Sequence, residues 1–129
     1  MAPHFLDIHR VLQIHLDLIK AYGGDEGVRD LGLLQSAVAM PQASFGGELL
    51  HKDLCEMAAA YLYHIVQDHP FVDGNKRTGA AAAIIFLAMN DVEIEADEEG
   101  LVDLTLAVAK GEADKAQAAE FFRRITHQP

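Results

Sequence analysis

The residues best suited to chemistry in this chain lie together near its middle, in the run His69-Pro-Phe-Val-Asp-Gly-Asn-Lys-Arg77. The run combines a histidine, a carboxylate at Asp73 and two adjacent cations, Lys76 and Arg77, and an alanine-rich helical pattern follows at once. Such a loop at a helix N-terminus binds anions, because unpaired backbone N–H groups and the helix dipole point at the ligand. The sequence therefore predicts phosphoryl or nucleotidyl transfer.

Two residues of the run are candidates for the reacting groups. His69 is the candidate base for an attacking hydroxyl, because histidine is the side chain best suited to proton transfer at neutral pH. Asp73 is the candidate ligand of a Mg²⁺ ion that bridges two phosphates, since that ion prefers one or two carboxylates together with phosphate oxygens.

The remaining residues of the run suit phosphate binding. Gly74 lets a phosphate approach the main chain, and Asn75 is expected to cap the following helix. The N–H groups of residues 75–77 would form an anion nest, to which Lys76 and Arg77 add charge. The spacing differs from that of a Walker loop. Each residue alone also fits an ordinary turn, but the combination favours a site.

The elements that must position this run are helices. Apolar periodicity and Asp N-caps predict them over residues 7–21, 30–39, 53–68, 75–90, 97–110 and 114–124. The helix over 75–90 is apolar nearly all round and should be the central buried one. Residues 41–51 contain adjacent glycines and are expected to form a short exposed hairpin or flap, and residues 92–95 a short extended piece. The expected fold class is all-α, a bundle of about six helices in a single domain over residues 1–129.

Composition narrows the possible functions. The net charge of −10 argues against a nucleic-acid binder and would suit a basic partner segment. No apolar run reaches the length of a membrane span, and the N-terminal residues do not read as a secretory signal. The single cysteine, Cys55, excludes an internal disulfide and is expected to be a buried structural thiol. The expected location is the cytoplasm.

The run resembles the active-site motif of the Fic/Doc superfamily, and its Asn-Lys-Arg version resembles the death-on-curing (Doc) toxins of bacterial toxin–antitoxin modules. The likeness covers essentially the whole chain. It includes Tyr22-Gly-Gly, Gly27-Val-Arg-Asp-Leu-Gly-Leu-Leu34, Pro41-Gln-x-x-Phe45-Gly-Gly and Val108-Ala-x-Gly111.

The resemblance implies a compact helical fold and transfer of a phosphate-containing group to a protein hydroxyl. Fic proteins typically attach AMP, whereas Doc toxins pass the γ-phosphate of ATP to elongation factor Tu. His69 would then be the base and Asp73 the Mg²⁺-linked carboxylate, while Gly74, Asn75, Lys76 and Arg77 would hold phosphates. The flap residues Phe45, Gly46 and Gly47 would align the target chain by strand-like pairing. A small antitoxin with a disordered tail that folds into the cleft is the implied partner.

Two departures from the AMP-transferring pattern favour a kinase. Those enzymes usually carry Gly where Lys76 stands, and a second Arg where this chain has Ala80. AMP transfer remains the alternative, and a non-catalytic protein that binds a nucleotide or a peptide is a third possibility.

Other residues that suggest sites are assigned to structure. His9, His15 and His64 lack the spacing of a metal site and are expected to have structural or surface roles. Ser44-Phe-Gly-Gly-Glu48 loosely matches the superfamily's inhibitory motif but is interpreted as flap. Arg29-Asp30 is interpreted as a helix start.

Overall fold

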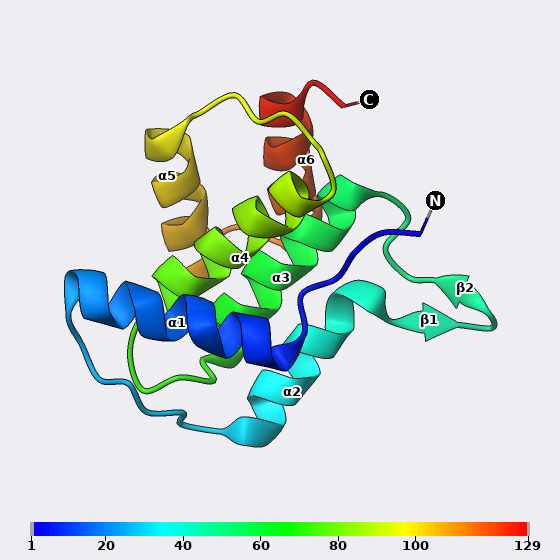
Figure 1. Cartoon of the computed structure of the whole chain (residues 1–129). Coiled ribbons are helices and arrows are strands. Elements are labelled where there is room, and N and C mark those ends of the chain that lie inside the picture. The colour runs from blue at the N-terminus through cyan, green and yellow to red at the C-terminus, as the bar shows by residue number, and fades with distance from the viewer. Residues whose placement is uncertain (1, 129) are drawn as a thin grey trace.

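A computed structural model describes residues 2–128, which form six α-helices, one 3₁₀ turn and a small hairpin (Figure 1). The helices are α1 (Ile8–Tyr22), α2 (Leu31–Ala39), α3 (Leu54–Asp68), α4 (Asn75–Met89), α5 (Glu98–Ala109) and α6 (Lys115–Thr126). The 3₁₀ turn is η1 (Met40–Gln42), and β1 (Ser44–Phe45) pairs antiparallel with β2 (Glu48–Leu49). The predicted fold class is confirmed, and the six predicted helices are all present.

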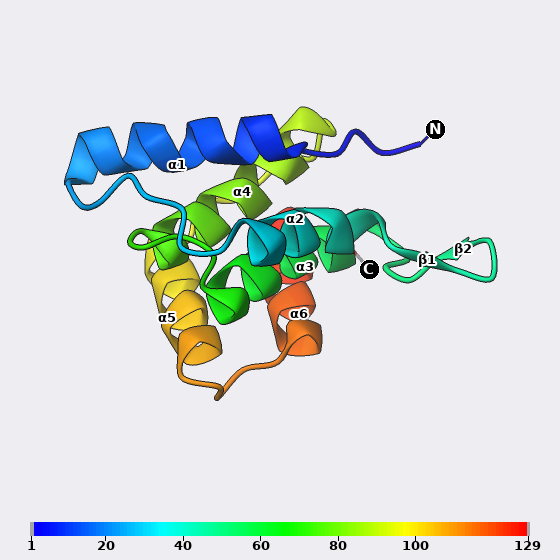
Figure 2. The same ribbon diagram turned by 90° about the horizontal axis from the view of Figure 1, so that it is seen from below.

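The centre of the fold is the pair α3 and α4. Helix α3 also packs against α2 and α6, and α4 packs against α1 and α5. Figure 2 shows α1 on one side of this pair and α5 and α6 on the other. Small residues bring the two central helices together: a Cβ added at Gly79 would lie 3.1 Å from the backbone oxygen of Leu62. Helix α4 is thus the central helix that its apolar sequence predicted.

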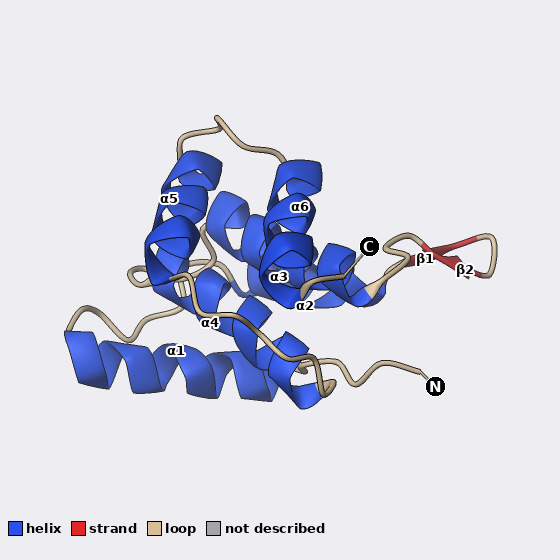
Figure 3. Cartoon of the chain, turned by 90° about the horizontal axis from the view of Figure 1, so that it is seen from above, coloured by secondary structure: helices blue, strands red, loops and turns tan. Residues whose placement is uncertain are grey.

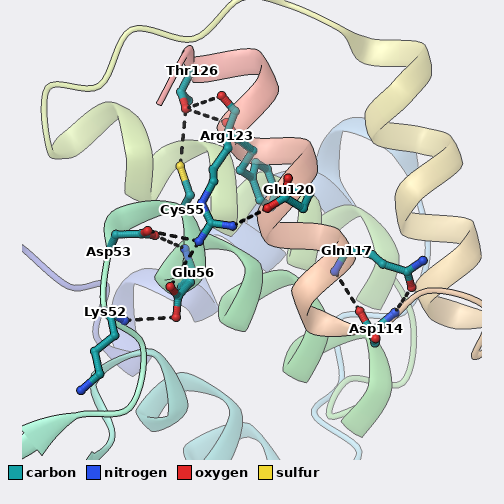
Figure 4. Close-up of polar contacts among 10 residues, drawn as sticks. Lys52, Asp53, Cys55, Glu56, Asp114, Gln117, Glu120, Arg123 and Thr126 are labelled. Atoms are coloured by element: carbon teal, nitrogen blue, oxygen red, sulfur yellow. Dashed lines mark hydrogen bonds and ion pairs between the residues drawn. The ribbon is translucent and has the colours of Figure 1, made fainter. Parts of the chain in front are cut away.

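Aspartates begin four of the helices at the positions that the sequence predicted. The carboxylates of Asp30, Asp53, Asp97 and Asp114 each accept a hydrogen bond from the backbone N–H three residues later. The capping box is reciprocal only at Asp114, whose own N–H donates to Gln117 (Figure 4). At Asp53 the box is shifted by one residue, because Glu56 accepts from the N–H of Lys52. These bonds satisfy donors that the first turn of a helix leaves free.

Helix α6 is tied to the start of α3 by one arginine. The Arg123 guanidinium lies 3.2 Å from a carboxylate oxygen of Asp53 and 3.2 Å from one of Glu56, and 2.7 Å from Glu120 (Figure 4). Beside it, the Cys55 thiol is buried 3.5 Å from the Thr126 hydroxyl, and burial raises its pKa. This environment fits the structural thiol that the sequence predicted.

The sequence predicted a short extended piece over residues 92–95, and in the structure these residues lie outside helices and strands, in the link between α4 and α5. A backbone bond from the Glu95 N–H to the Ile125 carbonyl, at 2.7 Å, ties this link to the end of α6. Among the helices of residues 2–128, none is long and apolar enough to cross a membrane.

The short exposed hairpin predicted within residues 41–51 is present, as β1 and β2 (Figure 3).

Candidate active site

The run at 69–77 forms the turn between the two central helices. Helix α3 ends at Asp68, and His69 adopts the left-handed conformation with φ 51°. Pro70 excludes continued helical geometry at His69, as the sequence predicted. Gly74, with φ 80°, is the N-cap of α4. The turn therefore places His69 and the N-terminus of α4 at the same end of the central pair.

A distant segment pairs with this turn like a short strand. Val28 forms an antiparallel bridge with Phe71, and the N–H of Val72 donates to the Gly27 carbonyl at 3.0 Å. The N–H of Arg29 donates to the Pro70 carbonyl at 2.7 Å. This part of the sequence was predicted only as a helix start. The structure adds a second role, as a backbone support for the 69–74 turn.

Asn75 does not cap helix α4, and that prediction is wrong. Its buried side chain turns back onto Phe71, accepting from the Phe71 N–H and donating to the Phe71 carbonyl, each at 2.9 Å. The cap position at Gly74 consequently has no side-chain acceptor. Because no side chain among residues 2–128 caps this helix, its first N–H groups, from Asn75 on, remain available to an external anion.

A cavity of about 640 Å³ opens beside the run, within the size range of small-molecule sites. At one end it is lined by the site residues His69, Asp73, Gly74, Asn75, Lys76 and Arg77. The opposite wall comes from α5, through Leu101, Val102, Thr105, Leu106 and Ala109. Sequence reasoning missed this wall. Two apolar residues of this wall, Val102 and Leu106, are 56% and 39% exposed in the structure.

The charges in the cavity are arranged for an anionic ligand. Neither Lys76 nor Arg77 takes part in an ion pair within residues 2–128, and both side chains are exposed. Asp73 accepts from the Gly74 N–H at 2.9 Å through one carboxylate oxygen. Its other oxygen lies against Gly24, where a Cβ would come within 2.6 Å. The carboxylate is therefore held in place beside two unpaired cations.

The candidate metal ligand is Asp73 alone. No group of three or more His, Cys, Asp or Glu able to hold a metal occurs among the described residues. A Mg²⁺ ion that takes one carboxylate and completes its shell with phosphate oxygens and water fits this arrangement, whereas a closed protein cage does not. His64 contacts Lys115 at 3.0 Å, and His15 is buried beneath the loop.

The predicted flap lies away from the run. Phe45 ends β1, and Gly46 and Gly47 form the turn to β2. The hairpin precedes α3, whereas His69 follows the other end of α3, and a helix of this length spans roughly 22 Å. Figures 1 and 2 show the hairpin projecting at the end of the molecule opposite the 69–74 turn. Phe45 is 88% exposed and no residue of the hairpin lines the cavity. In this conformation the structure does not bring the flap to His69.

Comparisons with known proteins show the family of this chain. A model of the Fic/DOC family matches residues 5–87, which include the run and its supports in α1 and the 27–30 segment. The chain is 35% identical to "Protein kinase doc" of Escherichia phage P1 over 115 residues, 89% of this chain and 90% of that protein. It is 49% identical to "Toxin Doc" of Mycolicibacterium smegmatis over 77 residues, 60% of this chain and 59% of that protein. The chain belongs to the Fic/DOC family, and its likeness is to Doc members of it.

Proposed function

We propose that this chain is the toxin of a type II toxin–antitoxin module and a protein kinase that passes the γ-phosphate of ATP to a hydroxyl of a translation factor like elongation factor Tu. The observation that carries the proposal is the uncapped N-terminus of α4, which shares a cavity with His69 and two unpaired cations. The names of the phage kinase and the mycobacterial toxin support it. The place of action would be the cytoplasm.

The roles follow from the positions in the cavity. The target hydroxyl oxygen attacks the γ-phosphorus, the bond from that phosphorus to the β–γ bridging oxygen breaks, and ADP leaves with the electron pair. His69 takes the hydroxyl proton. Lys76, Arg77 and the first N–H groups of α4, beginning at Asn75, hold the phosphates, and Gly74 lets them approach the main chain. Asp73 would hold Mg²⁺, which supplies further neutralisation of phosphate charge when it is bound.

A small antitoxin is the proposed partner. Its disordered tail would fold against the cavity, where the exposed apolar residues Val102 and Leu106 offer a surface to cover. Co-purification with the product of a neighbouring small gene tests this partner. Expression of the free chain without growth arrest would contradict the toxin role.

The reaction is tested with two labels. The protein is incubated with Mg²⁺, elongation factor Tu and either γ-labelled or α-labelled ATP, and we expect the target to take label only from the γ position. Label from the α position alone would instead support AMP transfer, for which the absent second arginine at Ala80 is the main objection. No transfer from either label would favour a binding protein.

Two single-histidine variants separate catalysis from binding. His69→Ala should reduce transfer by about 10²–10⁴-fold, the usual contribution of a general base, while binding of ATP persists. His9→Ala, at an exposed position of α1, is the matched control and should transfer at the normal rate. Equal activity of both variants would remove His69 from the mechanism.

A further inference from the structure

Two side chains from upstream elements hold the main chain of the two predicted reacting residues. The Arg29 guanidinium donates from Nε to the His69 carbonyl at 2.6 Å and from a terminal nitrogen to the Asp68 carbonyl at 2.9 Å. The His15 ring, in α1, lies with Nε2 2.8 Å from the Asp73 carbonyl oxygen. Neither Arg29 nor His15 lines the cavity, so any effect on a ligand there passes through other residues.

Arg29 acts at the end of α3. The carbonyls it binds belong to the last turn of that helix and the residue after it, where acceptors lack partners and a cation complements the helix dipole. His69 sits at φ 51°, a conformation that a residue with a side chain adopts at a cost and keeps only with outside support. The guanidinium fork and the backbone bond from Arg29 N–H to Pro70 supply that support and fix the direction of the His69 side chain.

His15 acts at the other end of the turn. Its side chain is 2% exposed and stacks flat on Phe71, with ring centres 3.7 Å apart and planes 5° from parallel. Because the partner of Nε2 is a carbonyl oxygen, that nitrogen must carry the proton. The same ring lies 3.5 Å from where a Cβ on Gly74 would stand. His15 therefore fixes the peptide between Asp73 and Gly74, where the carboxylate and the start of α4 meet.

We infer that Arg29 and His15 are positioning residues with separate duties, Arg29 for the base His69 and His15 for the phosphate-binding end at Asp73 and Gly74. The inference rests on the proposed function for its kinetic consequences. It predicts that the two residues affect different constants: loss of Arg29 bonds lowers kcat with little change in KM for ATP, and loss of the His15 bond raises KM for ATP.

The variants remove the donors and keep the bulk. Arg29→Met keeps an unbranched side chain without donors and should lower kcat by at least about tenfold, since small misplacements of a reacting group are costly. His15→Phe retains a ring to stack on Phe71 and should raise KM for ATP by about tenfold. His15→Gln, which can donate again, should restore much of that loss. Arg10→Met and His9→Phe, at exposed positions of α1, should leave both constants unchanged.

A purely structural role predicts a different outcome. In that case each variant would have both a lower kcat and a higher KM for ATP, in proportion to its fall in melting temperature. That outcome would overturn the inference. Wild-type constants in both variants would also overturn it.

A readout without turnover keeps this test apart from the proposed function. If the wild-type chain transfers no phosphate, the proposed function fails, but NMR of the full chain still tests the positions. Arg29→Met should shift the His69 ring resonances and spare the Gly74 amide, and His15→Phe should do the reverse. Shifts of both resonances in both variants, or of neither resonance in either variant, would contradict separate positioning.

Discussion

The guanidinium carbon of Arg77 lies 4.4 Å from the centre of the Tyr22 ring, so the last residue of α1 holds a cation at the edge of the cavity. Tyr22 is 64% exposed, which is unusual for an aromatic side chain with only a structural role. Together with His15, this contact makes one face of α1 a support for residues 73–77, where phosphate binding is proposed.

Removal of the Tyr22 ring should weaken nucleotide binding. A cation–π contact at an exposed site contributes about 0.5–1 kcal/mol, so Tyr22→Leu is expected to raise the Kd for ATP by roughly 2–5-fold. Tyr22→Phe keeps the ring and should bind ATP as the wild type does. Calorimetric titration of the three proteins checks this, and an equal loss in both variants would assign the effect to the Tyr22 hydroxyl instead.

The close approach of the central helices makes Gly79 sensitive to a single methyl group. A Cβ there would stand 2.9 Å from Val66 Cγ2 and 3.1 Å from the Leu62 backbone oxygen. Overpacking should outweigh the better helix propensity of alanine, so Gly79→Ala is expected to lower the free energy of unfolding by about 1–3 kcal/mol. Gly32→Ala, in α2 with its nearest neighbour at 3.4 Å, is the control and should be neutral or stabilising. Urea denaturation of the two variants checks the difference, and equal effects would contradict the packing argument.

Local sequence patterns predicted the helices, because the relevant information is short-range. Apolar periodicity and an Asp three residues before the N–H it binds both lie within one segment, and the observed helices follow them. The cluster at 69–77 was recognisable for the same reason, since its groups are adjacent in sequence. The expectation that His9, His15 and His64 bind no metal likewise rested on their spacing within single helices.

Long-range relations could not be predicted from those patterns. Asn75 before an apolar helix reads as a cap, but the turn, which pairs with the distant residues 27–29, brings both main-chain groups of Phe71 to the Asn75 side chain. The pairing of residues 27–30 with 69–72 and the wall from α5 depend on how separate helices pack. The position of the hairpin relative to His69 likewise depends on the direction of α3, which separates the two.

A partly buried histidine, His64, should make stability depend on pH. Burial, followed by the nearby Lys115 and His51, lowers the pKa of His64 to about 4. In the unfolded chain His64 takes up a proton as pH falls through about 6.5, whereas in the folded protein it does not until about pH 4. Protons therefore favour the unfolded state in this window, and stability is lost as pH falls from about 6.5 toward 4.

The contribution of His64 is measured by replacing it. Lowering the pH from 7 to 5 should cost the wild type about 1–2 kcal/mol of unfolding free energy through this residue. In the wild type the Lys115 amine lies 3.0 Å from the His64 ring, and His64→Gln keeps an acceptor for it. This variant should lose less stability over the same pH interval. His9→Gln, at an exposed position, should follow the wild type. Identical pH dependence in all three proteins would contradict the shifted pKa.

The hairpin can be tested as the proposed target-aligning element despite its distance from His69. Phe45 is 88% exposed, so Phe45→Ser should leave the melting temperature unchanged. Because the hairpin does not line the cavity, the Kd for ATP should also stay the same. If the hairpin contacts a large protein target, KM for that target should rise while kcat at saturation holds. A target can contact both Phe45 and His69 only through an extended surface or after a movement of the hairpin. An unchanged KM for the target would therefore exclude residues 45–47 from target binding. Leu31→Ser, at an exposed position of α2, controls for loss of exposed apolar surface in general.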